Sequence, residues 1–194
     1  MYLMILGAPG SGKGTQGQLI ARHLGIAEVS TGALLRAAVK DGTPLGRQAQ
    51  GYMDQGLLVP DQVVLALIRE ILDSPTAARG VLMDGFPRTV PQAVAVDQML
   101  RDRKARVDMV LLLDVAEAEL VKRLLARAAK EGRSDDNLES IKQRLRVYHE
   151  QTAPLVAYYD QQGVVRRIAG MGSVDEIQGR VREAVGLEAV GGKA

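Results

Sequence analysis

A short glycine-rich stretch near the start of the chain constrains its fold more than any other feature. Residues 7–15 read GAPGSGKGT, follow an apolar run at 1–6 and precede a segment with helical periodicity at 13–24. Glycines at such a junction let backbone N–H groups close around a phosphate, and the helix N-terminus adds partial positive charge. The pattern therefore predicts a phosphate-binding loop between a buried strand and a helix, in which Lys13 reaches the phosphate oxygens.

The rest of the chain alternates between apolar runs and segments with helical periodicity. This alternation predicts an α/β doubly wound fold with a five-stranded parallel sheet. We expect the strands at residues 1–6, 28–30, 80–84, 107–114 and 164–168. Helices are expected at 13–24, twice within 30–59, from Pro60 and from Thr89, and then at 116–130, 138–162 and 174–185.

Two of these helix starts have the pattern of a capping box, a hydroxyl residue followed three positions later by Glu or Gln. Thr89 with Gln92 is one, and Ser173 with Glu176 is the other.

Composition excludes several classes of protein. With no Cys and only two His among 194 residues, neither disulfides nor a cysteine- or histidine-rich metal site is expected. Aromatic residues make up 3% and the net charge is +2, which argues against a nucleic-acid partner. No run approaches the roughly 18 apolar residues of a membrane span, so we expect a cytoplasmic protein without a membrane partner.

An acidic residue ends one of the expected strands at the sheet edge where phosphates should bind. Asp84 closes the apolar run at 80–84 and is the acid that the pattern places to hold Mg²⁺ through water. The Ser or Thr that usually follows the lysine of such loops is Gly14 here, and Thr15 comes one position later.

Arginines recur at loop positions of the expected fold. Their planar, always-charged side chains are the donors that a transferring phosphoryl group needs around its oxygens. They are Arg36, Arg88, Arg123, Arg127, Arg133 and Arg144. Arg123 and Arg127 are four residues apart on one helix face, where their like charges repel unless an anion lies between them. Arg88 follows the strand end directly. Each of these arginines has the alternative of lying on a solvated helix face.

Five motifs in this order resemble the adenylate kinase family over residues 1–185. They are the loop at 7–15, STG at 30–32 with LR at 35–36, GLLVPD at 56–61, DGFPR at 84–88 with Gln92, and YHEQTAP at 148–154. The resemblance implies reversible transfer of phosphate from ATP, with Mg²⁺, to AMP, which gives two ADP.

The resemblance also implies roles for single residues. The positive charges that stabilise the transferring phosphoryl group would come from Lys13, Arg88, Arg123, Arg127, Arg133 and Arg144. ATP would be bound by Gly10, Ser11, Gly12, Lys13, Gly14, Thr15, Arg127 and Gly172. AMP would be bound by Thr31, Arg36, Leu57, Leu58, Val59, Gly85, Phe86, Pro87, Arg88, Gln92, Arg133 and Arg144. Asp84 would hold Mg²⁺ through water, in the second coordination shell of the metal.

The same resemblance divides the chain into segments. Residues 1–29, 60–126 and 137–185 would form the core, 30–59 a mobile AMP-binding segment, 127–136 a short lid and 186–194 a flexible tail. A lid without Cys cannot hold the four-cysteine zinc of some longer lids, and the expected state is a monomer.

Two other functions remain open on the sequence. One is a UMP/CMP kinase, which shares the fold and a short lid, and the other is a non-catalytic nucleotide-binding switch. Retention of Lys13, Asp84 and the phosphate arginines argues against the switch. Formation of ADP from ATP with AMP, UMP or CMP would separate the three.

Overall fold

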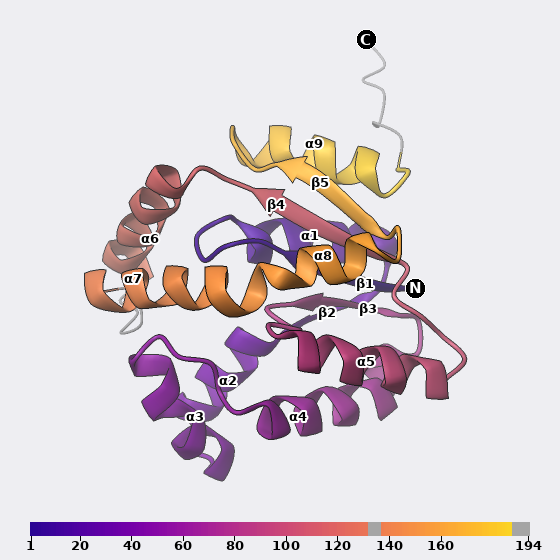
Figure 1. Ribbon diagram of the computed structural model, residues 1–194, viewed down its shortest axis with the longest axis horizontal. Coiled ribbons are helices and arrows are strands. Elements are labelled where there is room, and N and C mark those ends of the chain that lie inside the picture. Colours follow the sequence, from indigo (N-terminus) through magenta and orange to yellow (C-terminus); the bar gives the residue numbers. More distant parts are fainter. Residues whose placement is uncertain (132–136, 188–194) are drawn as a thin grey trace.

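A five-stranded parallel sheet lies at the centre of the computed structural model, which describes residues 1–131 and 137–187 (Figure 1). The spatial order is β2-β3-β1-β4-β5. The strands are β1 (Tyr2–Leu6), β2 (Ala27–Ser30), β3 (Val81–Asp84), β4 (Met109–Asp114) and β5 (Val165–Ala169). The predicted fold class and all five strands are confirmed, with their ends shifted by one or two residues.

Helices cover both faces of the sheet because both faces are apolar. Leu3 and Ile5 of β1 pack on α1 (Lys13–Leu24) and α9 (Val174–Ala184). Met4 and Leu6, the alternate residues, belong to the larger core on the other face. That core is built with α4 (Asp61–Asp73), α5 (Val90–Asp102) and α8 (Pro154–Asp160). In Figure 1, α9 lies above the sheet, while α4 and α5 lie below it.

Two helix pairs extend from the carboxyl ends of the strands. The first consists of α2 (Thr31–Lys40) and α3 (Pro44–Asp54), where Thr43 caps α3 by accepting from the Gly46 N–H at 3.0 Å. The second consists of α6 (Glu117–Glu131) and α7 (Leu138–Val147), which share a separate small core with the glycine-rich loop. Both pairs appear at the left of Figure 1.

The long helix expected at 138–162 is not continuous, which corrects the sequence prediction. Between α7 and α8 the chain forms a π-helical turn, Tyr148–Thr152, closed by a bond from the Ala153 N–H to the Tyr148 carbonyl at 2.8 Å. Pro154 follows this turn. A proline lacks the N–H that an α-helix needs and collides with the preceding turn, and a widened turn relieves both problems.

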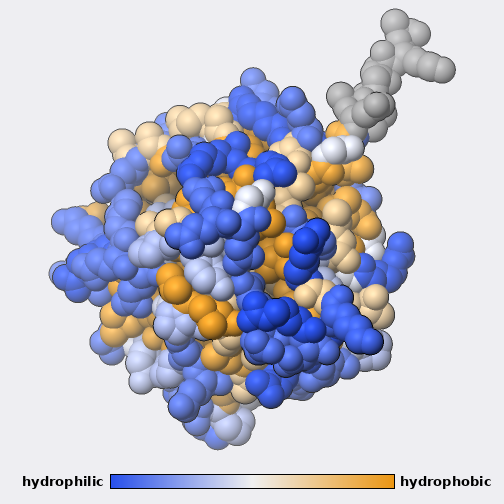
Figure 2. Space-filling model, turned by 45° about the vertical axis from the view of Figure 1, so that its right-hand side comes forward, coloured by the Kyte–Doolittle hydropathy of each residue, from blue (hydrophilic) through white to orange (hydrophobic). Residues whose placement is uncertain are grey.

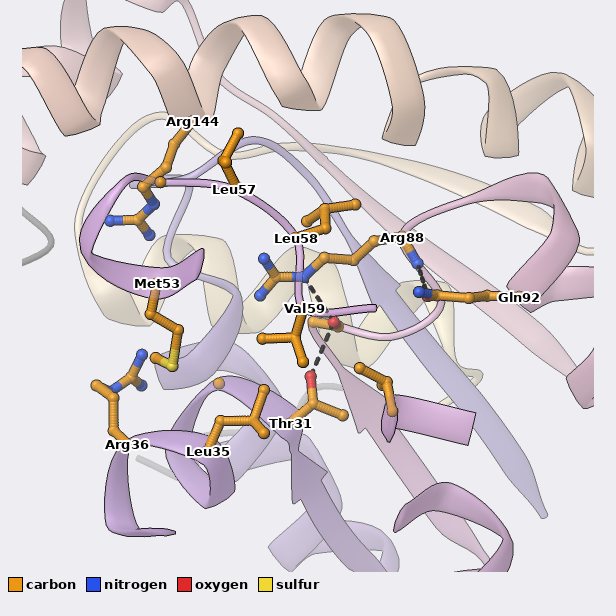
Figure 3. Close-up of a pocket in the computed structure, with 14 residues that line it drawn as sticks. Thr31, Leu35, Arg36, Met53, Leu57, Leu58, Val59, Arg88, Gln92 and Arg144 are labelled. Carbon is orange, nitrogen blue, oxygen red and sulfur yellow. Dashed lines mark hydrogen bonds between the residues drawn. The ribbon is translucent and has the colours of Figure 1, made fainter. Parts of the chain in front are cut away.

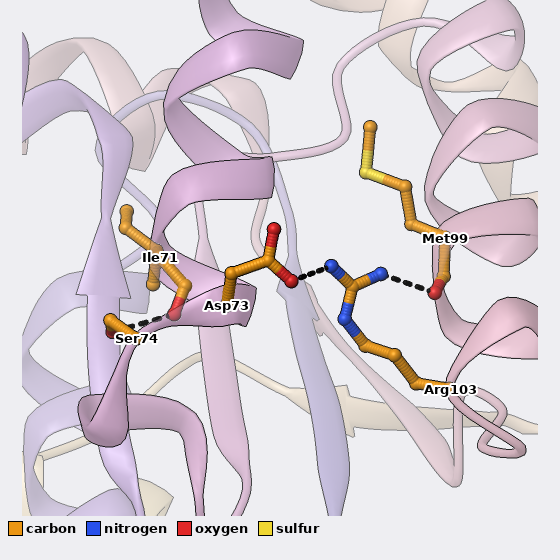
Figure 4. A network of polar contacts seen from close by, with 5 residues as sticks. All are labelled: Ile71, Asp73, Ser74, Met99 and Arg103. Carbon is orange, nitrogen blue, oxygen red and sulfur yellow. Dashed lines mark hydrogen bonds and ion pairs between the residues drawn. The ribbon is translucent and has the colours of Figure 1, made fainter.

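Polar contacts hold α4, α5 and α8 together on the face of the sheet opposite α1 and α9. Asp97 of α5 is buried and accepts from the hydroxyl of Tyr158 at 2.8 Å and from the amide of Gln162 at 3.0 Å. Burial, together with the Asp97 carboxylate, raises the pKa of Tyr158 to about 12. Arg103 pairs with Asp73 and donates to the Met99 carbonyl at 2.6 Å, which ties α4 to the end of α5 (Figure 4).

The surface is predominantly polar on the face shown in Figure 2, where hydrophobic residues appear in small patches between hydrophilic ones. Across residues 1–131 and 137–187, every helix is too short or too polar to cross a membrane.

Candidate functional site

The glycine-rich loop joins β1 to α1, as the sequence predicts. Gly10 and Gly12 have φ angles of 85° and 91°, in a region that favours glycine. A β-carbon on Gly10 would lie 2.9 Å from the Leu120 carbonyl oxygen, so the loop packs closely against α6. The space around Gly12, the N-cap of α1, is open. The loop is thus packed on one side and exposes the positive end of a helix on the other.

Lys13 is the first residue of α1, and its side chain donates to the Ala8 carbonyl of the loop at 2.9 Å. Burial lowers the pKa of Lys13 to about 8, and the positive charges of Arg88, Arg144 and Arg127 add to this effect. The Asp84 carboxylate acts in the opposite direction. Cations crowded together in this way favour an anion among them.

A large cleft opens in front of the loop. Gly10, Gly12, Lys13, Gly14 and Thr15 line one wall, and Arg36, Arg88, Arg123, Arg127 and Arg144 line others. Five of the six predicted arginines therefore meet in one space. Arg123 donates to the Glu119 carboxylate at 2.9 Å, so an acid on its own helix offsets the repulsion expected from Arg127.

A second space, the side pocket, lies between α2, α3 and the strand end at Gly85 (Figure 3). Nine of the twelve predicted AMP residues line it: Thr31, Arg36, Leu57, Leu58, Val59, Gly85, Arg88, Gln92 and Arg144. Leu35, Met53 and Val64 also line it and were missed, since apolar residues of amphipathic helices carry no functional signal in sequence.

Gln92 has different partners from those of a capping box. Thr89 does cap α5, accepting from the Gln92 N–H at 3.3 Å. However, the Gln92 side-chain oxygen accepts from the Arg88 N–H at 2.7 Å, and its amide nitrogen donates to Asp61 at 2.6 Å. The predicted box is therefore half formed, whereas the one at Ser173 and Glu176 is complete.

Asp84 lies beside the loop as predicted, and a second acid that the sequence analysis missed lines the same cleft. Asp84 is buried and accepts from the Ser30 hydroxyl at 3.1 Å. Glu28, two residues earlier on β2, has a buried Oε1 atom with no hydrogen-bond partner in the structure. A β-carbon on Gly14 would lie 3.6 Å from the Asp84 carboxylate.

These residues fit a hydrated Mg²⁺. Two carboxylates supply the acceptors that metal-bound waters need, Thr15 adds a hydroxyl, and Gly14 leaves the space between loop and acid open. No group of three metal-binding side chains occurs within the described ranges.

Glu28 leads to a prediction about pH. Burial, and secondarily the Asp84 charge, raise the pKa of Glu28 from 4.5 to about 7. The folded protein then keeps a proton that the unfolded chain releases near pH 4.5, so stability falls as the pH rises from about 4.5 to 7. Glu28→Gln should remove this loss. At pH 8 its free energy of unfolding should exceed that of wild type by ~1 kcal/mol, a modest gain because the side chain is only partly buried.

Urea unfolding at pH 5, 6.5 and 8 measures the effect. Glu70→Gln, on the exposed face of α4, is the matched control. A Glu28→Gln difference that does not grow with pH would contradict the assignment.

Several predicted residues lie elsewhere. Ser11, within the glycine-rich loop, and Phe86, in the larger core, are both fully buried. Pro87 lines a third space, the inner pocket, with Lys13 and Arg88. Gly172, with φ 116°, lies between β5 and α9 and is not among the residues lining the large cleft. Arg133, and with it half of the expected lid, falls outside the described residues, as does most of the expected tail.

This fold and this arrangement of loop, acid and arginines define a nucleotide kinase of the phosphate-binding-loop class. The sequence model of adenylate kinase matches residues 5–164. An adenylate kinase of Parabacteroides distasonis is 52% identical over 185 residues, covering 95% of this chain and 97% of that protein. An adenylate kinase of Leptospira biflexa is 49% identical, covering 94% of this chain and 98% of that protein. An adenylate kinase of Thermus thermophilus is also 49% identical, covering 95% of this chain and 97% of that protein. The chain belongs to the adenylate kinase family.

Proposed function

We propose that the two spaces described above are the two substrate sites of one enzyme, with ATP in the large cleft and AMP in the side pocket. Family membership gives the reaction, reversible phosphoryl transfer between ATP and AMP to yield two ADP. The observation that carries the assignment is that both spaces share part of their lining. Arg36, Arg88 and Arg144 line the large cleft and the side pocket alike.

The transferred group would pass where the two spaces meet. An oxygen of the AMP phosphate attacks the γ-phosphorus of ATP, and the bond to the β–γ bridging oxygen breaks, so ADP leaves as another ADP forms. Charge spreads over the phosphoryl oxygens in the transition state, and fixed cations stabilise it. Lys13, Arg88 and Arg144 would supply that charge, with Arg123 and Arg127 on the ATP side, and with Arg133 joining from the lid.

Mg²⁺ would be held through water by Asp84, with Glu28 and Thr15 beside it, and would neutralise phosphate charge when bound with ATP. Residues 30–59 would act as the mobile AMP-binding segment on the core formed by 1–29, 60–126 and 137–185, with 127–136 as a short lid. Closure of such segments excludes water, whose attack would waste ATP. We further propose a cytoplasmic monomer that needs no zinc.

The specificity for AMP would depend on Gln92. Its amide is engaged by Arg88 and Asp61 yet keeps one N–H and one oxygen lone pair, which match the N1 and amino group of adenine. Gln92→Leu should raise the KM for AMP several-fold or more, since unpaired buried groups cost about 1–3 kcal/mol, and leave that for ATP nearly unchanged.

A comparison with pyrimidine nucleotides separates base recognition from support of Arg88. Steady-state assays with AMP, UMP and CMP should show that wild type prefers AMP and that Gln92→Leu loses much of this preference. Equal losses for all three monophosphates would mean that Gln92 acts through Arg88 alone. Faster turnover of wild type with UMP or CMP than with AMP would contradict the proposed substrate.

A further inference from the structure

The motif at 148–154 contains a buried hydroxyl to which the site described above gives no role. Thr152 is 8% exposed and lies at the end of the π-helical turn. Its hydroxyl donates to the carbonyl oxygen of Arg88 at 2.9 Å, across 64 positions of sequence. Thr152 and Arg88 also line the inner pocket together with Lys13 and Tyr148.

The direction of this hydrogen bond is unusual for a helical threonine. Such a residue ordinarily turns its hydroxyl back to the carbonyl one turn earlier in its own helix. Here the hydroxyl donates to a different segment, the loop between β3 and α5. The contact therefore fixes the π-helical turn and the Arg88 backbone relative to each other.

Counting this contact, three hydrogen bonds fix Arg88. Its N–H donates to Gln92 at 2.7 Å, its carbonyl accepts from Thr152, and its side-chain Nε donates to the Gly85 carbonyl at 2.8 Å. Figure 3 shows the contacts to Gln92 and Gly85. Thr31 donates to the same Gly85 carbonyl at 2.8 Å.

A cation that stabilises a transition state works best when its position is set before the reaction, because no energy is then spent on moving it. The Arg88 side chain starts from a backbone whose two polar groups are each bonded to a buried side chain. Loss of one of these bonds would let the backbone shift while leaving the guanidinium present.

We propose that Thr152 is a positioning residue for Arg88, fixing its backbone through the carbonyl so that the guanidinium meets the phosphoryl group in one orientation. This inference rests on the proposed function, in which Arg88 contacts the transferred phosphate. Thr152 itself touches no reacting atom.

The test compares side chains that differ in the hydroxyl or the methyl group alone. Thr152→Val keeps the shape and loses the donor, and it should lower kcat about tenfold or more, since small displacements of reacting groups cost up to about 10²-fold. Thr152→Ser keeps the donor and should stay within about threefold of wild type. The Kd for ATP, measured by titration calorimetry, should be unchanged in both.

A double-mutant cycle shows whether Thr152 acts through Arg88. In an Arg88→Ala background the further change Thr152→Val should have no additional effect on kcat. Ser74→Ala is the matched control, because the Ser74 hydroxyl also donates to a backbone carbonyl, that of Ile71 at 2.7 Å, but far from the site (Figure 4). This control should leave kcat unchanged.

Each result decides the matter. The proposal is wrong if folded Thr152→Val keeps wild-type kcat, if Thr152→Ser loses as much as valine, or if valine costs the same factor with and without Arg88. Should the valine variant not fold, Thr152→Ala enters the same comparison. Full turnover in Arg88→Ala alone would instead overturn the proposed role of Arg88.

Discussion

Lys13→Met should lower kcat by about 10²–10³ while the protein remains folded, because one preorganised charge on the phosphoryl oxygens is lost. The residue is surrounded by the loop and by three arginines that act on its charge. Methionine has a similar length and removes that charge without leaving a large cavity. Steady-state kinetics and thermal unfolding of the same preparation measure both consequences.

The pH dependence of binding gives a second measurement on the same variant. In the free protein Lys13 has a pKa of about 8, so its charge is present below that pH and lost above it. An anionic nucleotide favours the charged form, so wild-type affinity for ATP should fall as the pH rises from 8 to 9.5. Lys13→Met should lack this fall.

Lys122→Met is the matched control. Lys122 is exposed on α6, and its ammonium nitrogen lies 3.9 Å from a Glu119 carboxylate oxygen. Its replacement should leave kcat and the pH dependence of binding unchanged. Turnover of Lys13→Met within a few-fold of wild type would contradict the role given to the loop lysine.

Gly46→Ala should damage AMP binding selectively. A β-carbon at Gly46 would lie 1.9 Å from the Ala38 carbonyl oxygen, a backbone atom that cannot rotate away. Overpacking of this kind costs about 1–3 kcal/mol or forces α3 away from α2. Since α2 and α3 carry Leu35, Arg36 and Met53 into the side pocket, we expect the Kd for AMP to rise about tenfold, which is 1.4 kcal/mol.

The same helix offers a control that differs only in its surroundings. A β-carbon at Gly51, also in α3, meets no atom within 4 Å. Gly51→Ala should therefore keep AMP affinity and stabilise the helix by about 0.5–1 kcal/mol. Titration calorimetry with AMP and with ATP gives both affinities. Equal loss of AMP and ATP affinity in Gly46→Ala would indicate general destabilisation instead of damage to one site.

Local chemistry could be predicted from the sequence because it depends on neighbouring residues. The loop at 7–15 requires a strand before it and a helix after it, and the apolar runs predict all five strands of the sheet. Arg88 was identified in the same way, since an arginine that follows a strand end lies at one edge of a parallel sheet, whereas the roles of the other arginines came from the family resemblance. Five of the six predicted arginines do line one cleft.

Contacts between distant segments were decided by the tertiary structure alone. Parallel pairing places Ser30 of β2 beside Asp84 of β3, which brings Glu28 to the same cleft, and no local pattern contains that register. Gln92 has the spacing of a cap, but its amide nitrogen bonds to Asp61 because α4 and α5 pack side by side. The bond from Thr152 to Arg88 likewise depends on how the π-helical turn lies against the loop after β3, a property of the folded chain and not of either segment by itself.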